Sequence, residues 1–293
     1  MTQLDLLALL PGDGPCPDDL LMVSAGQYRV VLAKARRLNW RDRTRKAALR
    51  GLVDRQRDFE RLMTCGTVLP VLPGTQIAAS AVPVLVAANE PLLDRLARQL
   101  AGRVQFQITI HWPDDAAAAY FGWPDDVAAT RGAAALRARV FATVADASED
   151  QTELPSAPGV FFNSVVLVPN DAVARLDVAL EDIDAIWPDG FRIRCVGPSP
   201  AVSFASLGMH KITPKAVQAA RAALALPPGA TGEAIAAARR RVLMSSKPDL
   251  RPALTTAADL LEASTRAGTD TFGHLYTWSE GRASISDDAR NVA

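Results

Sequence analysis

The spacing of apolar and polar residues predicts alternating strands and helices over the first part of the chain. Apolar residues recur three and four positions apart over residues 41–63 and 81–100, which is typical of amphipathic helices. Apolar runs with the length of strands lie at residues 4–10, 20–24, 28–33 and 104–110, and TVLPVLPGTQI, residues 67–77, predicts a further strand with a turn. Antiparallel pairing of these strands in one sheet, with both helices on one face, is the most economical packing. We therefore predict a modified ferredoxin-like domain over residues 1–122.

A second, smaller α+β domain is predicted over residues 123–209, with a helical linker at its start. An alanine-rich segment predicts a helix up to about residue 145, and a linker rich in polar residues and proline follows it. A strand over 160–169 then leads into a helix over 170–187. The apolar seam of this helix consists of Val173, Leu176, Leu180, Ile183 and Trp187.

The stretch FRIRCVGPSPAVSF, residues 191–204, carries two prolines two positions apart in an apolar context. Proline removes a backbone donor and fixes φ, so a central strand tolerates it poorly. We predict a strand that ends at Val196, a rigid corner, and a short second strand that ends near Phe204. The corner is expected to close the sheet of the second domain, with Val202 and Phe204 as core anchors. A contribution of the corner to a binding surface is the second interpretation.

Helices alone are predicted after the second domain. Helical periodicity covers residues 214–225, 232–244 and 252–265, so residues 210–267 are expected to form a helical region. The remaining residues, 268–293, are polar with isolated aromatic side chains, which predicts a flexible tail.

Composition and charge narrow the class of protein. The chain has 293 residues, of which 49% are hydrophobic, and its 32 basic residues balance 32 acidic ones. A chain of this length can bury a sizeable core, and the balance gives no overall bias toward polyanions. The scattered cysteines Cys16, Cys65 and Cys195 argue for a reducing compartment and against a disulfide framework. Without a basic segment before the first apolar run or an apolar stretch of membrane-spanning length, we expect a cytoplasmic protein and no membrane partner.

The sequence lacks the common catalytic and nucleotide-binding motifs. It has no Gly-x-x-x-x-Gly-Lys run, no Gly-x-Ser-x-Gly elbow and no His-Glu-x-x-His pair. Its three histidines are too far apart to have the spacing of metal ligands. Asp177, Glu181 and Asp184 share a predicted helix face, where a solvated face is favoured over a general acid–base pair. We predict a protein that is not an enzyme and that needs neither metal nor cofactor.

A basic run, KARRLNWRDRTRKAALRGLVDRQRDFERL, includes the first long predicted helix. A solvated face is the favoured interpretation, because acidic residues interleave with the basic ones. A protein-docking face is the second interpretation. An RNA-binding face is the third, and nucleic acid is the least favoured partner because no strand carries a Lys/Arg-Gly-Phe/Tyr signature.

Three stretches are more specific than any of these features: TVLPVLPGT at 67–75, VVLVP at 165–169 and RCVGPSPAVSF at 194–204. Their order and content resemble the gas-vesicle protein F/L family, which comprises accessory proteins of buoyant, gas-filled organelles. The resemblance spans roughly residues 4–210. The residues that carry it, and that are candidates for partner contact, are Pro70, Gly74, Thr75, Gly197, Pro198, Pro200 and Phe204.

The resemblance implies an N-terminal modified ferredoxin-like domain followed by a smaller α+β domain. It also implies a minor structural component or assembly factor of the gas vesicle. Its implied partners are the small, very hydrophobic shell protein and other gas-vesicle accessory proteins, and its implied location is the cytoplasm and the gas vesicle. The chain departs from the family pattern at Pro73, where an aromatic residue is usual, and at Ser199, Ala201 and Val202, which replace Trp, Pro and Tyr.

The C-terminal helices resemble, more faintly, a degenerate J-domain. A basic helix precedes Lys-Pro-Asp in this chain, at the place where J-domains have His-Pro-Asp. The residues that carry this likeness are Arg239, Arg240, Arg241, Lys247, Pro248 and Asp249. The likeness implies an Hsp70-type chaperone as partner. The favoured alternative is a plain helical hairpin in which the proline and the aspartate start the next helix.

Overall fold

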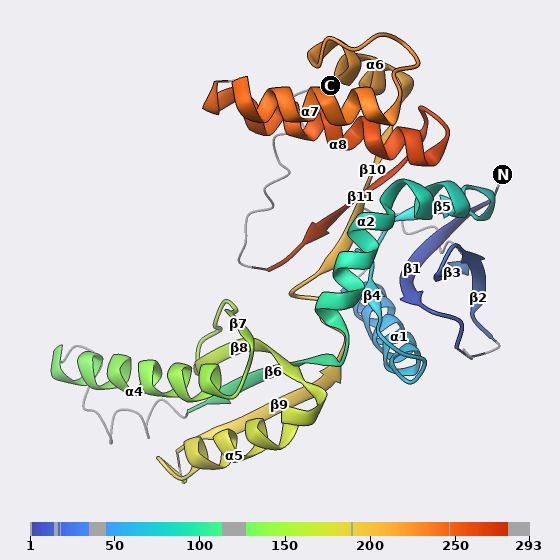
Figure 1. Cartoon of the computed structure of the whole chain (residues 1–293). Helices are drawn as coiled ribbons and strands as arrows, with labels where there is room; N and C mark the ends of the chain where they lie inside the picture. Colours follow the sequence, from blue (N-terminus) through green and yellow to red (C-terminus); the bar gives the residue numbers. More distant parts are fainter. Residues whose placement is uncertain are drawn as a thin grey trace.

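The computed structural model describes residues 2–14, 17, 19–34, 45–112, 127–188, 190–245 and 247–280. These residues form two antiparallel sheets with packed helices, a two-stranded ribbon, and three helices at one end of the ribbon (Figure 1). The predicted α+β class is therefore confirmed. Cys16, the predicted helix start at residues 41–44 and the segment 113–126 lie outside the described residues. No described helix is both long and apolar enough to cross a membrane.

The first sheet is formed by the N-terminal strands in the order β2-β3-β1-β4, with β5 also paired to β1. Its strands are β1 (Gln3–Pro11), β2 (Leu21–Ala25), β3 (Tyr28–Lys34), β4 (Leu69–Pro70) and β5 (Gln76–Ala78). Strands β2 and β3 form a hairpin, as the sequence predicts. Gly26 supports its tight turn, because this residue has a φ of 55° in the left-handed region.

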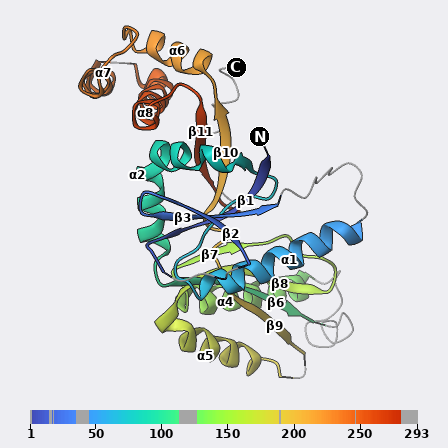
Figure 2. The same cartoon turned by 90° about the vertical axis from the view of Figure 1, so that its right-hand side faces the viewer.

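Two helices, α1 (Arg45–Met63) and α2 (Val82–Leu100), lie on opposite faces of the first sheet (Figure 2). From β1, Leu6 and Leu9 belong to the core on the α2 side, and Leu7 and Leu10 belong to the core on the α1 side. The prediction that both helices cover one face is wrong. The physical reason is the continuous apolar run of β1, which needs a cover on each face.

The second sheet has the strand order β7-β8-β6-β9. Its strands are β6 (Arg103–His111), β7 (Asp150–Glu153), β8 (Val160–Pro169) and β9 (Arg192–Ser199). Helices α4 (Val127–Asp146) and α5 (Val173–Asp184) pack on one face, where the predicted apolar seam of residues 173–187 joins the core. Strand β7 lies inside the segment that was expected to be a linker.

Strand β6 corrects a second expectation, because it pairs with β8 and β9 and not with the strands of the first sheet. Its alternating residues Val104, Phe106, Ile108 and Ile110 are buried together with α4 and α5. An alternating strand needs one apolar cover, and helices α4 and α5 on the second sheet supply that cover. The predicted domain limits at residues 122 and 209 stay a prediction.

The third part of the molecule is the ribbon of β10 (Ser206–Ile212) and β11 (Phe272–Trp278) with its helices. The helices are α6 (Pro214–Ala223), α7 (Gly232–Ser245) and α8 (Arg251–Ala267), close to the three predicted ones. Short 3₁₀ turns, η1 (Ala79–Ala81), η2 (Asn170–Ala172) and η3 (Pro248–Leu250), precede α2, α5 and α8.

Strand β11 corrects the prediction of a flexible tail over 268–293. Residues 272–278 pair with β10 along their whole length, whereas residues 281–293 lie outside the described part of the chain. Phe272 is buried among the C-terminal helices, and Leu275 is buried in the core of the first sheet. The ribbon therefore ties the C-terminal helices to the N-terminal part of the molecule.

Candidate functional site

Two of the motif stretches, residues 67–75 and residues 194–204, meet where the first sheet, the second sheet and the ribbon join. They are called the first and the second motif stretch below. Val71 forms a parallel bridge with Leu207 of β10, and the amide of Leu72 donates to the Leu207 carbonyl at 2.8 Å. The amide of Val71 donates to the Leu7 carbonyl at 3.1 Å. Residues 67–75 thus lie between β1 and the strand that follows the proline corner.

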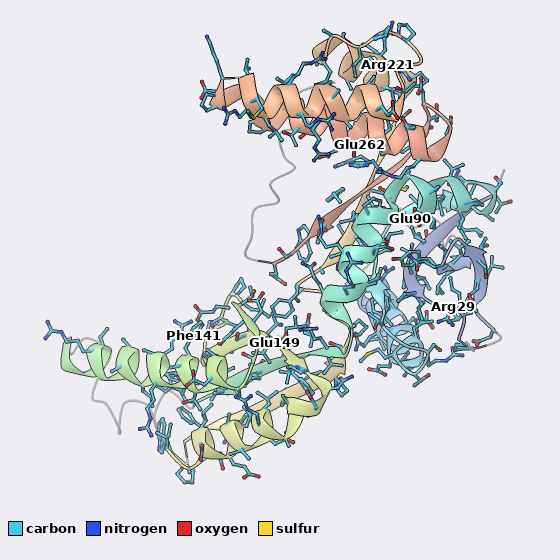
Figure 3. The ribbon with its side chains drawn as sticks, in the orientation of Figure 1. Arg29, Glu90, Phe141, Glu149, Arg221 and Glu262 are labelled. Carbon is cyan, nitrogen blue, oxygen red and sulfur yellow. The ribbon has the colours of Figure 1, made fainter. Side chains whose placement is uncertain are left out.

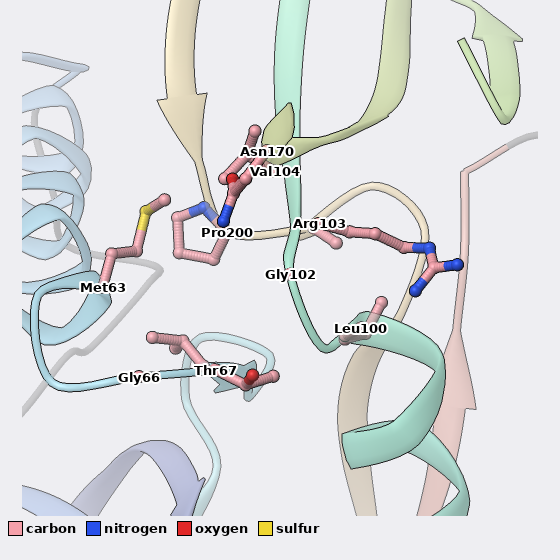
Figure 4. A pocket seen from close by; sticks show the side chains of 11 residues that line it. Met63, Gly66, Thr67, Leu100, Gly102, Arg103, Val104, Asn170 and Pro200 are labelled. Carbon is pink, nitrogen blue, oxygen red and sulfur yellow. The ribbon is translucent and has the colours of Figure 1, made fainter. Parts of the chain in front are cut away.

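A cavity of about 230 Å³ marks this junction (Figure 4). It is lined by Met63, Gly66, Thr67, Val68, Leu100, Gly102, Arg103, Val104, Asn170, Pro200 and Ala201. Arg103 extends away from Pro200 in this view, and it forms an ion pair with Glu149. The volume is below the 300–1,000 Å³ that is usual for small-molecule sites, which favours a packing gap between the stretches 67–75 and 194–204 over a ligand pocket.

The first motif stretch is held by its own turn. Pro70 is buried in β4, and Gly74 is exposed with a φ of 86° that favours glycine. The hydroxyl of Thr75 donates to the Leu72 carbonyl at 2.9 Å, and the Thr75 carbonyl accepts from the amide of Leu6 at 2.8 Å. These three predicted residues shape a turn, and only Gly74 presents an open surface.

The second motif stretch packs closely on β6. A Cβ atom on Gly197 would lie 2.5 Å from the Phe106 ring and 2.8 Å from the Gln105 carbonyl, so the position has no room for a side chain. The Gly197–Pro198 peptide bond is cis. Pro198 is exposed, whereas Pro200 is buried at the cavity.

The predicted short strand that ends at Phe204 is wrong. Residues 202–204 form a turn, in which the amide of Ala205 donates to the Ala201 carbonyl at 2.9 Å. Phe204 packs against the core of the first sheet, and Val202 packs on its α1 side. Both residues are anchors as predicted, but the corner does not close the second sheet. It leads the chain from the second sheet into the core of the first.

Gln105 holds this corner, a role that the sequence pattern does not indicate. The side-chain oxygen of Gln105 accepts from the amide of Ser203 at 2.9 Å, and its Nε2 donates to the Ser203 hydroxyl at 3.3 Å. The hydroxyl of Ser199 donates to the Gln105 carbonyl at 3.2 Å. A glutamine on the polar side of a strand suggests contact with water, so the sequence gives no signal that this side chain is buried.

Strand β9 enters the corner along an exposed edge. Residues 194–198 are exposed, and Val196 retains 46% of its accessible surface. Cys195 is exposed as a residue, but partial desolvation of its thiol raises the pKa of this group, and the nearby Asp177 carboxylate adds to the shift. Because the thiolate is the reactive form, this shift makes Cys195 a poor nucleophile at neutral pH.

The carboxylates that were considered for acid–base chemistry, Asp177, Glu181 and Asp184, are all exposed on α5. Their exposure agrees with the solvated-face interpretation. Within the described ranges, no group of three or more His, Cys, Asp and Glu side chains is placed to hold a metal ion.

Two arginines of the basic helix α1 form contacts within the molecule, Arg55 in a part-buried position and Arg61 on the exposed surface. Arg55 stacks on Phe59 and donates to the carbonyls of Leu7 and Val71. Arg61 is paired with Asp19, with 3.0 Å between Nη1 and Oδ2. These contacts link α1 to the first sheet and its neighbouring loop, and those of Arg55 take its guanidinium out of any RNA-binding face.

The residues of the J-domain likeness lie at one end of the C-terminal helices. Arg239 on α7 pairs with Asp259 at 2.7 Å and with Glu262 at 3.2 Å, both on α8. Glu262 is labelled in Figure 3. Arg240, Arg241, Lys247, Pro248 and Asp249 are exposed. Pro248 and Asp249 open η3, which leads into α8, as in a plain helical hairpin. The Hsp70 partner stays a prediction.

Residues 126–206 match the family model described as gas vesicle synthesis protein GvpL/GvpF. The resemblance to this family is confirmed. The matched segment contains the second sheet apart from β6, together with the proline corner. This match supports a gas-vesicle accessory role.

Two solved structures have a similar fold. The gas vesicle protein GvpF from Anabaena sp. PCC7120 aligns with a TM-score of 0.55 and 18% identity, over 68% of this chain and 94% of that one. GvpF from Microcystis aeruginosa aligns with a TM-score of 0.53 and 18% identity, over 68% and 97% of the two chains. At this identity the likeness shows the fold alone. No curated protein matches the chain.

Proposed function

We propose that this protein is a non-enzymatic accessory protein of gas vesicles that binds the small hydrophobic shell protein during vesicle formation. The observation that carries the proposal is the GvpL/GvpF match over residues 126–206, which includes the proline corner and its exposed approach strand β9. Other gas-vesicle accessory proteins are further partners in this proposal, and the cytoplasm and the vesicle are its location.

The physical need for such a partner follows from the shell itself. A subunit that presents an apolar face to gas exposes a large apolar patch before it polymerises, and such a patch promotes aggregation. A partner that covers the patch holds the subunit until it joins the shell. The function requires a binding surface and no catalytic group.

Co-expression with the shell protein tests the proposal. We expect the shell protein to co-purify with the full chain in the soluble fraction, and to aggregate when the chain is left out. The genes beside this one should encode small, hydrophobic, nearly identical shell proteins. A shell protein that stays aggregated and does not bind the chain would overturn the proposed function.

An Hsp70-type adaptor is a second candidate, which is favoured by the exposed apolar side chains beside Lys247-Pro248-Asp249. Leu243, Met244 and Leu250 retain 50%, 85% and 54% of their accessible surface. The test is the ATP turnover of an Hsp70 with the full chain and with Asp249→Asn. Equal turnover with the chain, with the variant and with neither of them would exclude this candidate.

A further inference from the structure

Strand β9 is an open edge of the second sheet. It pairs with β6 on one side, and no other described strand pairs with it. Figure 1 shows β9 at the rim of the sheet beside α5. Of its eight residues, residues 192–196 pair with β6 in a regular register, and a register shift follows before Ser199, so the regular edge is as long as β2, with five residues, and longer than the border strands β4, with two, and β7, with four. An edge of this length offers main-chain donors and acceptors to another strand.

The register of β9 gives its two faces different chemistry. Arg192, Arg194 and Val196 lie opposite His111, Thr109 and Gln107 on the polar face of the sheet. Ile193 and Cys195 lie opposite Ile110 and Ile108 on the face that packs against α4 and α5. An added strand would therefore lie beside two arginines on one face and beside the margin of an apolar core on the other.

We propose that β9 binds an extended segment of the shell protein by strand addition. This inference rests on the proposed function and names the binding site for it. The segment alternates acidic and apolar residues, with the acidic side chains beside Arg192 and Arg194. Main-chain hydrogen bonds supply affinity in this mode, and the alternating side chains supply specificity. Asp177 lies on the core side near Cys195 and disfavours an acidic side chain there.

The competing interpretation is an edge that is closed to partners. Arginines on an edge strand and a proline at its end, here Pro198, are devices that prevent pairing between sheets. A second copy of this chain is the other occupant that an open edge could accept. The experiments below separate these cases from capture of the shell segment.

Hydrogen–deuterium exchange of the full chain, alone and in complex with the shell protein, reports directly on the edge. We expect amide exchange in residues 193–197 to slow at least tenfold in the complex. The border strand β2, residues 21–25, serves as the internal control and should not change. Binding of the shell protein without protection of β9 would overturn this inference and leave the proposed function intact. Failure of the shell protein to bind at all would overturn both.

Charge reversal tests the chemistry of the segment. Arg192→Glu/Arg194→Glu should raise the Kd for the shell protein at least tenfold, and lysine in place of the acidic residues of the protected shell segment should restore binding. The matched control is Arg240→Glu/Lys247→Glu on the C-terminal helices, where both side chains are exposed and the Kd should not change. Equal losses for the two double variants would overturn the proposal.

A second pair of variants avoids any change to the arginines. Val196→Asp adds a repelling charge on the open edge, whereas Val178→Asp adds it on the exposed side of α5, at a position with 55% of its surface accessible. We expect loss of shell binding for Val196→Asp alone, with thermal unfolding unchanged in both. Sedimentation of the free chain completes the test, because a dimer that Val196→Asp dissociates would assign the edge to a second copy and overturn the proposal.

Discussion

Strands β1 and β9 have nearly the same length, nine and eight residues, but they differ in what covers them. Seven consecutive residues of β1 are buried, because α1 and α2 pack on its two faces and strands pair on both sides. Most of β9 is exposed; among the described strands only β6 pairs with it, and α1 contacts part of it. Position in the sheet therefore decides whether a strand holds the fold together or presents a surface.

The sequences of the two strands carry the same difference. The residues QLDLLALLP of β1 form a nearly continuous apolar run, which is typical of a strand with two covered faces. The residues RIRCVGPS of β9 place arginines on alternate positions and end in glycine and proline. We infer that the first sheet provides stability and that the free border of the second sheet is available for a partner.

The largest effect is expected from a cavity in the first sheet. Leu9 is fully buried, and Leu9→Ala should lower the free energy of unfolding by about 2–5 kcal/mol. Val196→Ala removes a smaller, half-exposed side chain and should cost less than about 0.5 kcal/mol. Urea denaturation of the two variants measures the difference. Similar losses would contradict the distinction between a covered and an open strand.

A second prediction concerns strand β11, whose main chain is hydrogen-bonded by the side chain of Asn89. Asn89 on α2 donates to the Gly273 carbonyl at 2.8 Å, and its oxygen accepts from the amide of Leu275 at 2.8 Å. Asn89→Ala leaves both main-chain groups of β11 without this partner and should cost about 2 kcal/mol. It should also speed amide exchange in β11. Gln27→Ala, which removes an exposed hydrogen bond to Asp94, is the control and should leave exchange in β11 unchanged.

These elements also show what the sequence could and could not predict. Hydrophobic periodicity predicts β1, the β2–β3 hairpin, α2 and the helices at the end of the chain, because each pattern is continuous and local. It predicts β6 as a strand with one apolar face, but a period of two does not identify the neighbouring strands. The assignment of β6 to the first sheet failed for this reason.

The missed features depend on contacts between distant parts of the chain. Strand β11 looks like a polar tail because His274 and Tyr276 interrupt its apolar residues, and its cover comes from Asn89 on α2. Gln105 looks like a solvated residue, although it is buried by the corner that follows β9. At the candidate site, the sequence predicted the corner and its anchors, but not the turn or the sheet to which it leads.

A smaller effect is expected where β9 meets the corner. Gly197→Ala places a methyl group against the Phe106 ring and the Gln105 carbonyl, so β9 must shift away from β6. We expect a loss of about 1–3 kcal/mol in the free energy of unfolding. Gly232→Ala is the control, because no described atom outside its own helix turn and chain neighbours lies within 4 Å of the added methyl group. A neutral Gly197→Ala would show that the inner side of β9 is as loosely packed as its outer side.

The smallest effect is a pH dependence that belongs to the ribbon and not to β9. Burial lowers the pKa of His274 below its ordinary value of 6.5, and His210 on β10 and Arg266 on α8 lower it further. Well above pH 6.5, His274 is neutral in both the folded and the unfolded chain, so its contribution to stability is fully present. As the pH falls below 6.5, the unfolded chain binds the proton first, and the free energy of unfolding falls by at most about 1.4 kcal/mol per pH unit. The loss levels off once the pH is below the pKa of the folded state.

Urea denaturation between pH 7.5 and 5.5 measures this dependence of the free energy of unfolding on pH. We expect the same slope in the wild type and in His111→Gln, which changes an exposed position on β6, and a flatter slope in His274→Gln. An unchanged slope in His274→Gln would show that β11 is as open to solvent as β9.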